Sequence, residues 1–172
     1  MAMKNSGGGE HSLSESWKIF IEYYPLFKKL ERAITGRPWF SDGWIIYTGH
    51  FSEGIFLQLY KAGWHNHNQR GIHLETWVSI DGVRNRSVPV VLHIERETPH
   101  REEVNRLLVE RGTGLMTSWP GYSVSRSNVM ERFIHRIPLS RNTLVRQLTT
   151  EFNRVQEIGA IIDEAFAEIS ER

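Results

Sequence analysis

The stretch that decides the fold is residues 71–97, GIHLETWVSIDGVRNRSVPVVLHIERE. Apolar and polar residues alternate along 71–80 and again along 87–97, which is the period of a strand with one buried face. Between them, residues 81–86 contain an Asp-Gly pair and an Asn, which are typical of turns. The stretch therefore predicts an antiparallel hairpin at the centre of a sheet. Its predicted core face carries Ile72, Leu74, Val78, Val90, Leu92 and Ile94.

The opposite face of this hairpin is polar. It carries His73, Glu75, Trp77, His93 and Glu95, and a hairpin centred on 81–86 places Glu75 opposite His93 and His73 opposite Glu95. Two imidazoles and two carboxylates are a donor set for Zn, Mn or Fe, and such a metal can activate water or polarise a phosphate. A solvated or partner-facing side of a half-buried sheet has the same pattern. Both interpretations stay open.

Other candidates surround this patch. His65 and His67 precede the hairpin in a polar loop. If this loop folds over the patch, the two histidines are candidates for further metal ligands or for a general base. Otherwise the loop is a simple soluble connection. Arg84 and Arg86 at the predicted turn suit phosphate binding through their planar guanidinium groups, but arginines are also common in solvated turns. Trp77 is expected to stack on a ligand or anchor a partner, or else to be covered by the first helix or by the loop that contains Trp64.

The N-terminal part predicts a leader followed by a helix. Residues 1–11 are polar and Gly-rich, so we expect a flexible leader, and residues 12–172 form a single domain. The helix is expected to begin at Ser12, because apolar residues then follow at helical spacing, and Pro25 is expected to kink or divide it.

The rest of the chain predicts further strands and two more helices. A helix should follow Thr98 and Pro99 and stop near Gly112 and Gly114, because glycine favours helix ends. The sequence leaves the strand order after Trp119 open. Extended segments are expected at 44–48, 55–61, 122–126 and 129–137, the last two as a hairpin about Ser127–Asn128 or as one strand entered by a loop.

The C-terminal helix is predicted to be unusually long. Apolar residues recur every three or four positions from Leu144 to Ile169. Such a helix spans on the order of 45 Å, whereas an eight-residue strand spans about 27 Å. It therefore bends or breaks near Gly159, or its 158–169 end overhangs the domain and forms a homodimer contact.

The fold class follows from these elements. We predict an α+β domain with an antiparallel sheet of four to six strands built on the hairpin 71–97. One face of the sheet is packed by an N-terminal helix, a short middle helix and a long C-terminal helix. A chain of 172 residues with 40% hydrophobic residues suits one such domain.

Composition excludes several classes. There is no cysteine, which rules out disulfides, thiolate zinc sites and a cysteine nucleophile. No run of apolar residues is long enough for a membrane span, and no secretion signal is present, so we expect a cytoplasmic protein with no membrane contact. The net charge is only +1, and arginines concentrate between Arg70 and Arg154, which gives a mildly basic middle.

These observations support three hypotheses of function. The first is a non-enzymatic binding or regulatory module that needs no cofactor and binds an unknown protein or small molecule on the outer sheet face. The alternative is a metal-dependent hydrolase of phosphodiesters that holds Zn or Mn through His73, Glu75, His93 and Glu95. The third is a weak nucleic-acid binder. Phosphate-binding Gly-rich loops, nucleophile elbows and zinc-protease motifs are absent from the sequence.

Overall fold

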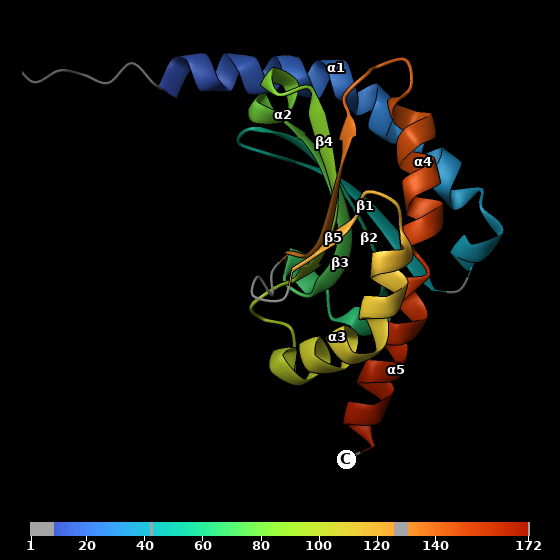
Figure 1. Ribbon diagram of the computed structural model, residues 1–172. Helices are drawn as coiled ribbons and strands as arrows, with labels where there is room; N and C mark the ends of the chain where they lie inside the picture. Colours follow the sequence, from blue (N-terminus) through green and yellow to red (C-terminus); the bar gives the residue numbers. More distant parts are fainter. Residues whose placement is uncertain (1–8, 42, 126–130, 172) are drawn as a thin grey trace, which may run out of the picture.

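The computed structural model describes residues 9–41, 43–125 and 131–171. In it, six antiparallel strands form one sheet that is packed by helices on one face (Figure 1). The strand order is β1-β2-β3-β4-β6-β5, so the last two strands join beyond β4. The strands are β1 (Trp44–Phe51), β2 (Gly54–Lys61), β3 (Ile72–Ser79), β4 (Ser87–Ile94), β5 (Ser123–Val124) and β6 (Glu131–Pro138).

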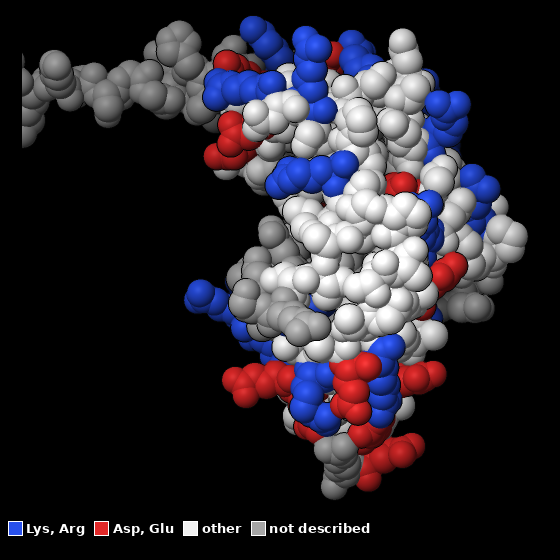
Figure 2. Space-filling model, in the orientation of Figure 1, with Lys and Arg blue, Asp and Glu red and all other residues white. Residues whose placement is uncertain are grey.

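The helices gather on one side, as predicted. Figure 1 shows α3, α4 and α5 on the same side of the sheet, with α1 running along its upper end. Figure 2, in the same orientation, shows the molecule hollowed on the other side. The helices are α1 (Gly9–Thr35), α2 (Ile80–Arg84), α3 (Arg101–Ser118), α4 (Leu144–Val155) and α5 (Ile158–Ser170), with single turns η1 (Pro38–Ser41), η2 (Ala62–Trp64) and η3 (His67–Gln69).

The core lies between the sheet and these helices. Leu74 and Leu92 are fully buried together with the other apolar residues predicted for the inner face of the hairpin. Phe27 from α1 and Phe152 from α4 pack into the same cluster. The prediction that the helices cover this face is confirmed.

Helix α1 begins at Gly9, whereas the sequence predicted a start at Ser12. It continues through Pro25, where a kink or division was expected, and Figure 1 shows it changing direction along its length. Residues 9–11 of the predicted leader therefore belong to the helix. Residues 1–8 and the predicted hairpin about Ser127–Asn128 lie outside the described residues.

Helix α3 passes through Gly112 and Gly114 and ends at Ser118, so the predicted end near these glycines is wrong. The reason is packing. A Cβ atom at Gly112 would lie 3.1 Å from Cδ1 of Ile158, which shows that the glycine lets α3 approach α5 closely. Close helix packing here outweighs the low helix propensity of glycine.

The C-terminal helix divides into α4 and α5 between Val155 and Ile158, close to the predicted break. Ile158 and Ile162 are fully buried within the protein's own core. The homodimer contact proposed for residues 158–169 stays a prediction. Among the described residues, no helix combines the length and apolar character needed to cross a membrane.

The connection of the central hairpin differs from the prediction. Residues 80–84 form the short helix α2, which Ser79 caps by accepting a 3.0 Å hydrogen bond from the Gly82 N–H. His73 lies opposite His93 instead of Glu95, and Glu75 lies opposite Val91. This two-residue change of register leaves each side chain on its predicted face, because faces alternate with a period of two.

Candidate functional site

The outer face of the sheet carries a hollow of about 400 Å³. Its polar floor comes from β2, β3 and β4, and aromatic side chains form its walls. The candidates His73, Glu75, Trp77, His93 and Glu95 all line it, and Phe51, Phe56, Gln58 and Gln69 complete the lining. The structure therefore brings together the five residues that the sequence placed on the polar face of the hairpin.

His73 is only 1% exposed, although it lies on the outer face. Its Nδ1 lies 2.9 Å from Oδ1 of Asn66, and the same oxygen accepts a hydrogen bond from the Gly71 N–H at 3.1 Å. Because this oxygen can only accept, His73 Nδ1 must carry the proton. In the neutral ring, Nε2 therefore presents its lone pair to the hollow.

Gln58 connects Asn66 with the floor of the hollow. Its Oε1 accepts from the Asn66 Nδ2–H at 3.2 Å, so its amide nitrogen faces the other way. That nitrogen lies 3.1 Å from His73 Nε2 and donates to Glu75 Oε1 at 3.2 Å. In this network of Asn66, Gln58, His73 and Glu75, each of these side chains has a hydrogen-bond partner. Polar atoms can be buried with little loss of stability only when they are hydrogen-bonded in this way.

Glu75 is the charged centre of the floor. Its Oε2 lies 2.8 Å from His93 Nδ1 and 3.7 Å from His73 Nε2. Burial raises the pKa of this carboxyl, but the neighbouring imidazoles of His73 and His93 outweigh burial and hold the pKa at about 2. Glu75 is therefore ionised, and His93 Nδ1 donates to it.

His93 joins the polar floor to the aromatic wall. Its ring stacks on Trp77, with ring centroids 5.9 Å apart, and meets the His73 ring edge-on. Glu95 Oε1 lies 4.0 Å from His93 Nδ1. Metal-ligand atoms of His73, His93 and Glu95 all lie within 4.8 Å of one another, so these residues could hold a metal ion.

The loop 62–70 is folded against the floor in an unusual backbone conformation. His65, Asn68 and Gln69 have positive φ angles of 56°, 54° and 63°, which are uncommon for residues other than glycine. A Cβ atom at Gly71 would lie 2.3 Å from the His65 carbonyl oxygen, so only glycine permits this close approach. This loop conformation places the Asn66 side chain beside His73.

The remaining candidates lie elsewhere. His65 packs its ring against Phe166 at 5.1 Å, and His65 and His67 line a separate pocket with Arg70 and Glu97. Neither histidine lines the hollow. We therefore find no geometric support for these loop histidines as further ligands of the hollow.

The two arginine candidates lie at the end of the hairpin that carries α2. Arg84 forms an ion pair with Glu15 of α1 at 3.0 Å and approaches Asp81 at 3.9 Å. Arg86 follows α2 with a positive φ of 52°. Neither residue lines the hollow.

Sequence reasoning missed Asn66, Gln58 and two aromatic walls. Gln58 and Phe56 point outward from β2, and Phe51 points outward from β1, so strand alternation would have placed them on this face once the pairing was known. Asn66 had no such signal, because it lies in an irregular loop.

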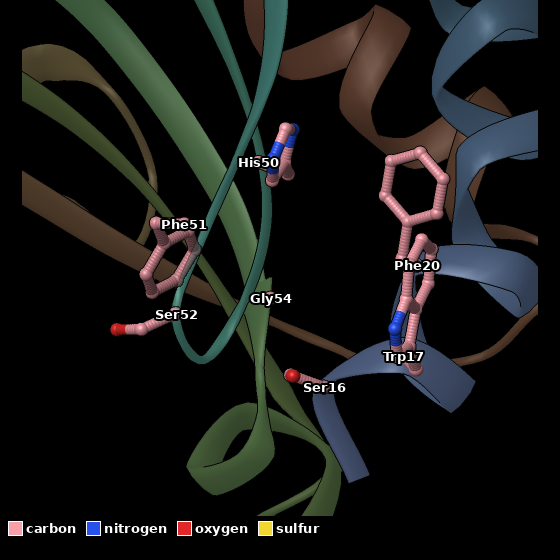
Figure 3. A pocket seen from close by; sticks show the side chains of 7 residues that line it. All are labelled: Ser16, Trp17, Phe20, His50, Phe51, Ser52 and Gly54. Atoms are coloured by element: carbon pink, nitrogen blue, oxygen red, sulfur yellow. The ribbon is translucent and has the colours of Figure 1, made fainter. Parts of the chain in front are cut away.

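A second pocket, of about 390 Å³, lies between α1 and the turn of β1 and β2. Figure 3 shows Trp17 and Phe20 of α1 on one side of it and Phe51 and His50 of β1 on the other. It is mainly apolar, and Trp17 is 62% exposed. Phe51 lines both this pocket and the hollow, so the two are neighbours.

Comparison of the chain with protein families, curated proteins and solved structures found no match. A fold class alone does not define a function, because one architecture can carry many different sites. Function is therefore inferred from the residues of the hollow and their chemistry.

Proposed function

We propose that the protein is a non-enzymatic ligand-binding module and that the hollow on the outer sheet face is its binding site. One observation carries this proposal: aromatic walls surround a buried, fully hydrogen-bonded polar floor on the sheet face opposite the helices. Ligand sites are typically concave and mainly apolar, with a few polar groups held in place, and have volumes of roughly 300–1,000 Å³.

The walls suit a flat apolar group. Trp77 is held in place by stacking on His93, so a ligand ring that packs on it meets a rigid surface. Phe51 and Tyr47 are 36% and 43% exposed, which extends the apolar surface along β1. Rigid aromatic side chains are favoured in binding sites because little side-chain freedom is lost on binding.

The test is titration of the chelator-treated full chain with N-phenyl-1-naphthylamine, a neutral dye that fluoresces in apolar surroundings. We expect saturable binding to the protein and binding weakened by about 5-fold to 100-fold in Trp77→Ala, as expected for loss of an aromatic stacking partner. The neighbouring pocket supplies the matched control, because Trp17→Ala removes its exposed aromatic wall. Binding lost in Trp17→Ala but kept in Trp77→Ala would place the dye in the wrong pocket and contradict the proposal.

A metal-dependent hydrolase of phosphodiesters is the second candidate. The observation that favours it is the convergence of His73, His93 and Glu95 on one point of the hollow. It ranks second because the residues that line the hollow include no Lys or Arg to hold a phosphate. Turnover of bis(p-nitrophenyl) phosphate with Zn or Mn, absent in Glu95→Gln, would move it ahead of the binding module.

Weak nucleic-acid binding and a cytoplasmic location stay predictions. Several arginines of the basic middle form ion pairs, including Arg70 with Glu97 and Arg106 with Glu110. At the lower end of the view in Figure 2, basic and acidic side chains are interleaved rather than separated. Affinity for DNA that falls steeply with salt would support the nucleic-acid hypothesis.

A further inference from the structure

The floor of the hollow has the dimensions of a metal site. Tetrahedral Zn with bonds of roughly 2.0–2.1 Å places its ligand atoms about 3.3 Å apart. His73 Nε2 and His93 Nδ1 are 3.3 Å apart, which matches that spacing. Glu95 Oε1 lies 4.0 Å from His93 Nδ1, so a small movement of this half-buried side chain completes a set of three.

His73 is oriented as a metal ligand needs to be. Ligand histidines usually donate their other ring N–H to an oxygen atom, which fixes the tautomer and the direction of the lone pair. Asn66 Oδ1 supplies that oxygen at 2.9 Å from His73 Nδ1, and Asn66 is held by the Gly71 N–H. The strained loop 65–70 thus keeps His73 Nε2 directed at the floor.

Charge also favours a cation at this point. The Glu75 carboxyl group lies 2.8 Å from His93 Nδ1 and 3.7 Å from His73 Nε2, and Glu95 brings a second carboxyl group to within 4.0 Å of His93 Nδ1. A divalent ion at this point therefore meets two carboxyl groups and two imidazole nitrogens. Nitrogen donors favour Zn over Mg and Ca, which prefer sites made of oxygen atoms.

We propose that His73, His93 and Glu95 bind one Zn²⁺ ion at the floor of the hollow. The ion replaces the Gln58 amide N–H at His73 Nε2 and the proton that His93 Nδ1 donates to Glu75. That proton leaves to solvent or to Nε2 of the same ring. Three protein ligands leave one tetrahedral position, which faces the hollow and its aromatic walls.

This inference rests on the proposed binding function and specifies its ligand class. The ligand carries a flat apolar group that packs on Trp77 and, next to it, an atom that coordinates the ion. 4-Phenylimidazole has both features in one small molecule. It should bind the zinc-loaded protein at least about 10-fold more tightly than the chelator-treated protein, because coordination adds to stacking.

The first experiment is calorimetric titration of Zn²⁺ into the untagged, chelator-treated full chain. We expect one site with micromolar or tighter affinity, no comparable binding of Mg²⁺, and an intense visible spectrum of four-coordinate Co²⁺. His93→Ala and Glu95→Gln should abolish binding. His67→Ala is the matched control, because His67 lies in the adjacent loop outside the hollow and its loss should change nothing.

Asn66 is a positioning residue in this proposal. Asn66→Ala should lower Zn²⁺ affinity by about 10-fold to 100-fold. Asn66→Asp keeps an oxygen for His73 Nδ1 and should restore affinity, even if both variants lower the melting temperature of the metal-free protein equally. If Asn66 only stabilised the fold, the Zn²⁺ affinity of each variant would instead fall in proportion to its loss of melting temperature.

Clear outcomes overturn the proposal. Absence of Zn²⁺ binding by the folded intact chain refutes it, as does equal loss of binding in His67→Ala and His93→Ala. Circular dichroism identifies any variant that fails to fold. In that case the test uses Glu95→Gln, because Glu95 is only half-buried and its replacement disturbs the fold least. The dye titration without metal remains independent, so failure of the zinc site and failure of the binding function are distinguishable.

Discussion

Replacing Glu75 with Gln should destabilise the fold strongly at neutral pH. The Glu75 carboxylate accepts hydrogen bonds from His93 Nδ1 and Gln58 Nε2 on its two oxygens. Glutamine offers only one oxygen, so its NH₂ group would face either the Gln58 amide, which is also a donor, or His93 Nδ1, whose proton would then have to move to Nε2. The variant therefore loses the charge, and it either leaves one buried donor without an acceptor or forces His93 into its other tautomer.

The size of the effect follows from the lowered pKa. Folding moves the pKa of Glu75 from 4.5 to about 2, and one unit corresponds to about 1.4 kcal/mol, so the carboxylate contributes about 3 kcal/mol at pH 7. Because the folded-state pKa is the lower one, the contribution is complete above about pH 4.5 and is lost as pH falls toward 2. At pH 3 about 1.4 kcal/mol should remain.

The assay is urea unfolding of both proteins at pH 7 and pH 3 with a chelator present, followed by circular dichroism. Glu97→Gln is the matched control, because Glu97 is 60% exposed and pairs with an exposed Arg70. The control should lose less than about 1 kcal/mol. A loss below about 1 kcal/mol for Glu75→Gln at pH 7, or an equal loss at both pH values, would refute the reasoning.

Three further predictions concern the fold. Leu92→Ala should lower the free energy of unfolding by about 2–5 kcal/mol, because Leu92 is fully buried; an unchanged urea midpoint would contradict this. Gly112→Val should cost about 1–3 kcal/mol, because its side chain meets Ile158, whereas Gly114→Ala, which has open space, should be tolerated in the same thermal melts. Light scattering that shows a monomer at high concentration would remove the predicted homodimer through residues 158–169.

Much of the fold followed from local patterns. The alternation along 71–80 and 87–97 identified two strands and assigned Leu74 and Leu92 to the core, where they are buried. The predicted register was wrong by two residues, but the assignment to the core was still correct. A shift by two residues leaves every side chain on the same face of the sheet, because successive side chains point to alternate faces. Helical spacing likewise identified the N-terminal and C-terminal helices.

Other features depended on contacts between distant segments. The end of α3 was misjudged because Gly112 is retained for close packing against Ile158, which no local pattern reveals. The position of β6 beside β4 is also a long-range pairing that the sequence left open. Propensity describes a segment by itself, whereas packing decides between the alternatives it allows.

The site divides in the same way. The sequence by itself determined that His73, Glu75, Trp77, His93 and Glu95 share one face, because strand alternation is a local property. Only the tertiary structure decided that Gln58 and the loop residue Asn66 complete the floor. A strand pairing and a folded loop bring these side chains to His73 from other segments, and those contacts give the buried floor its hydrogen-bond partners.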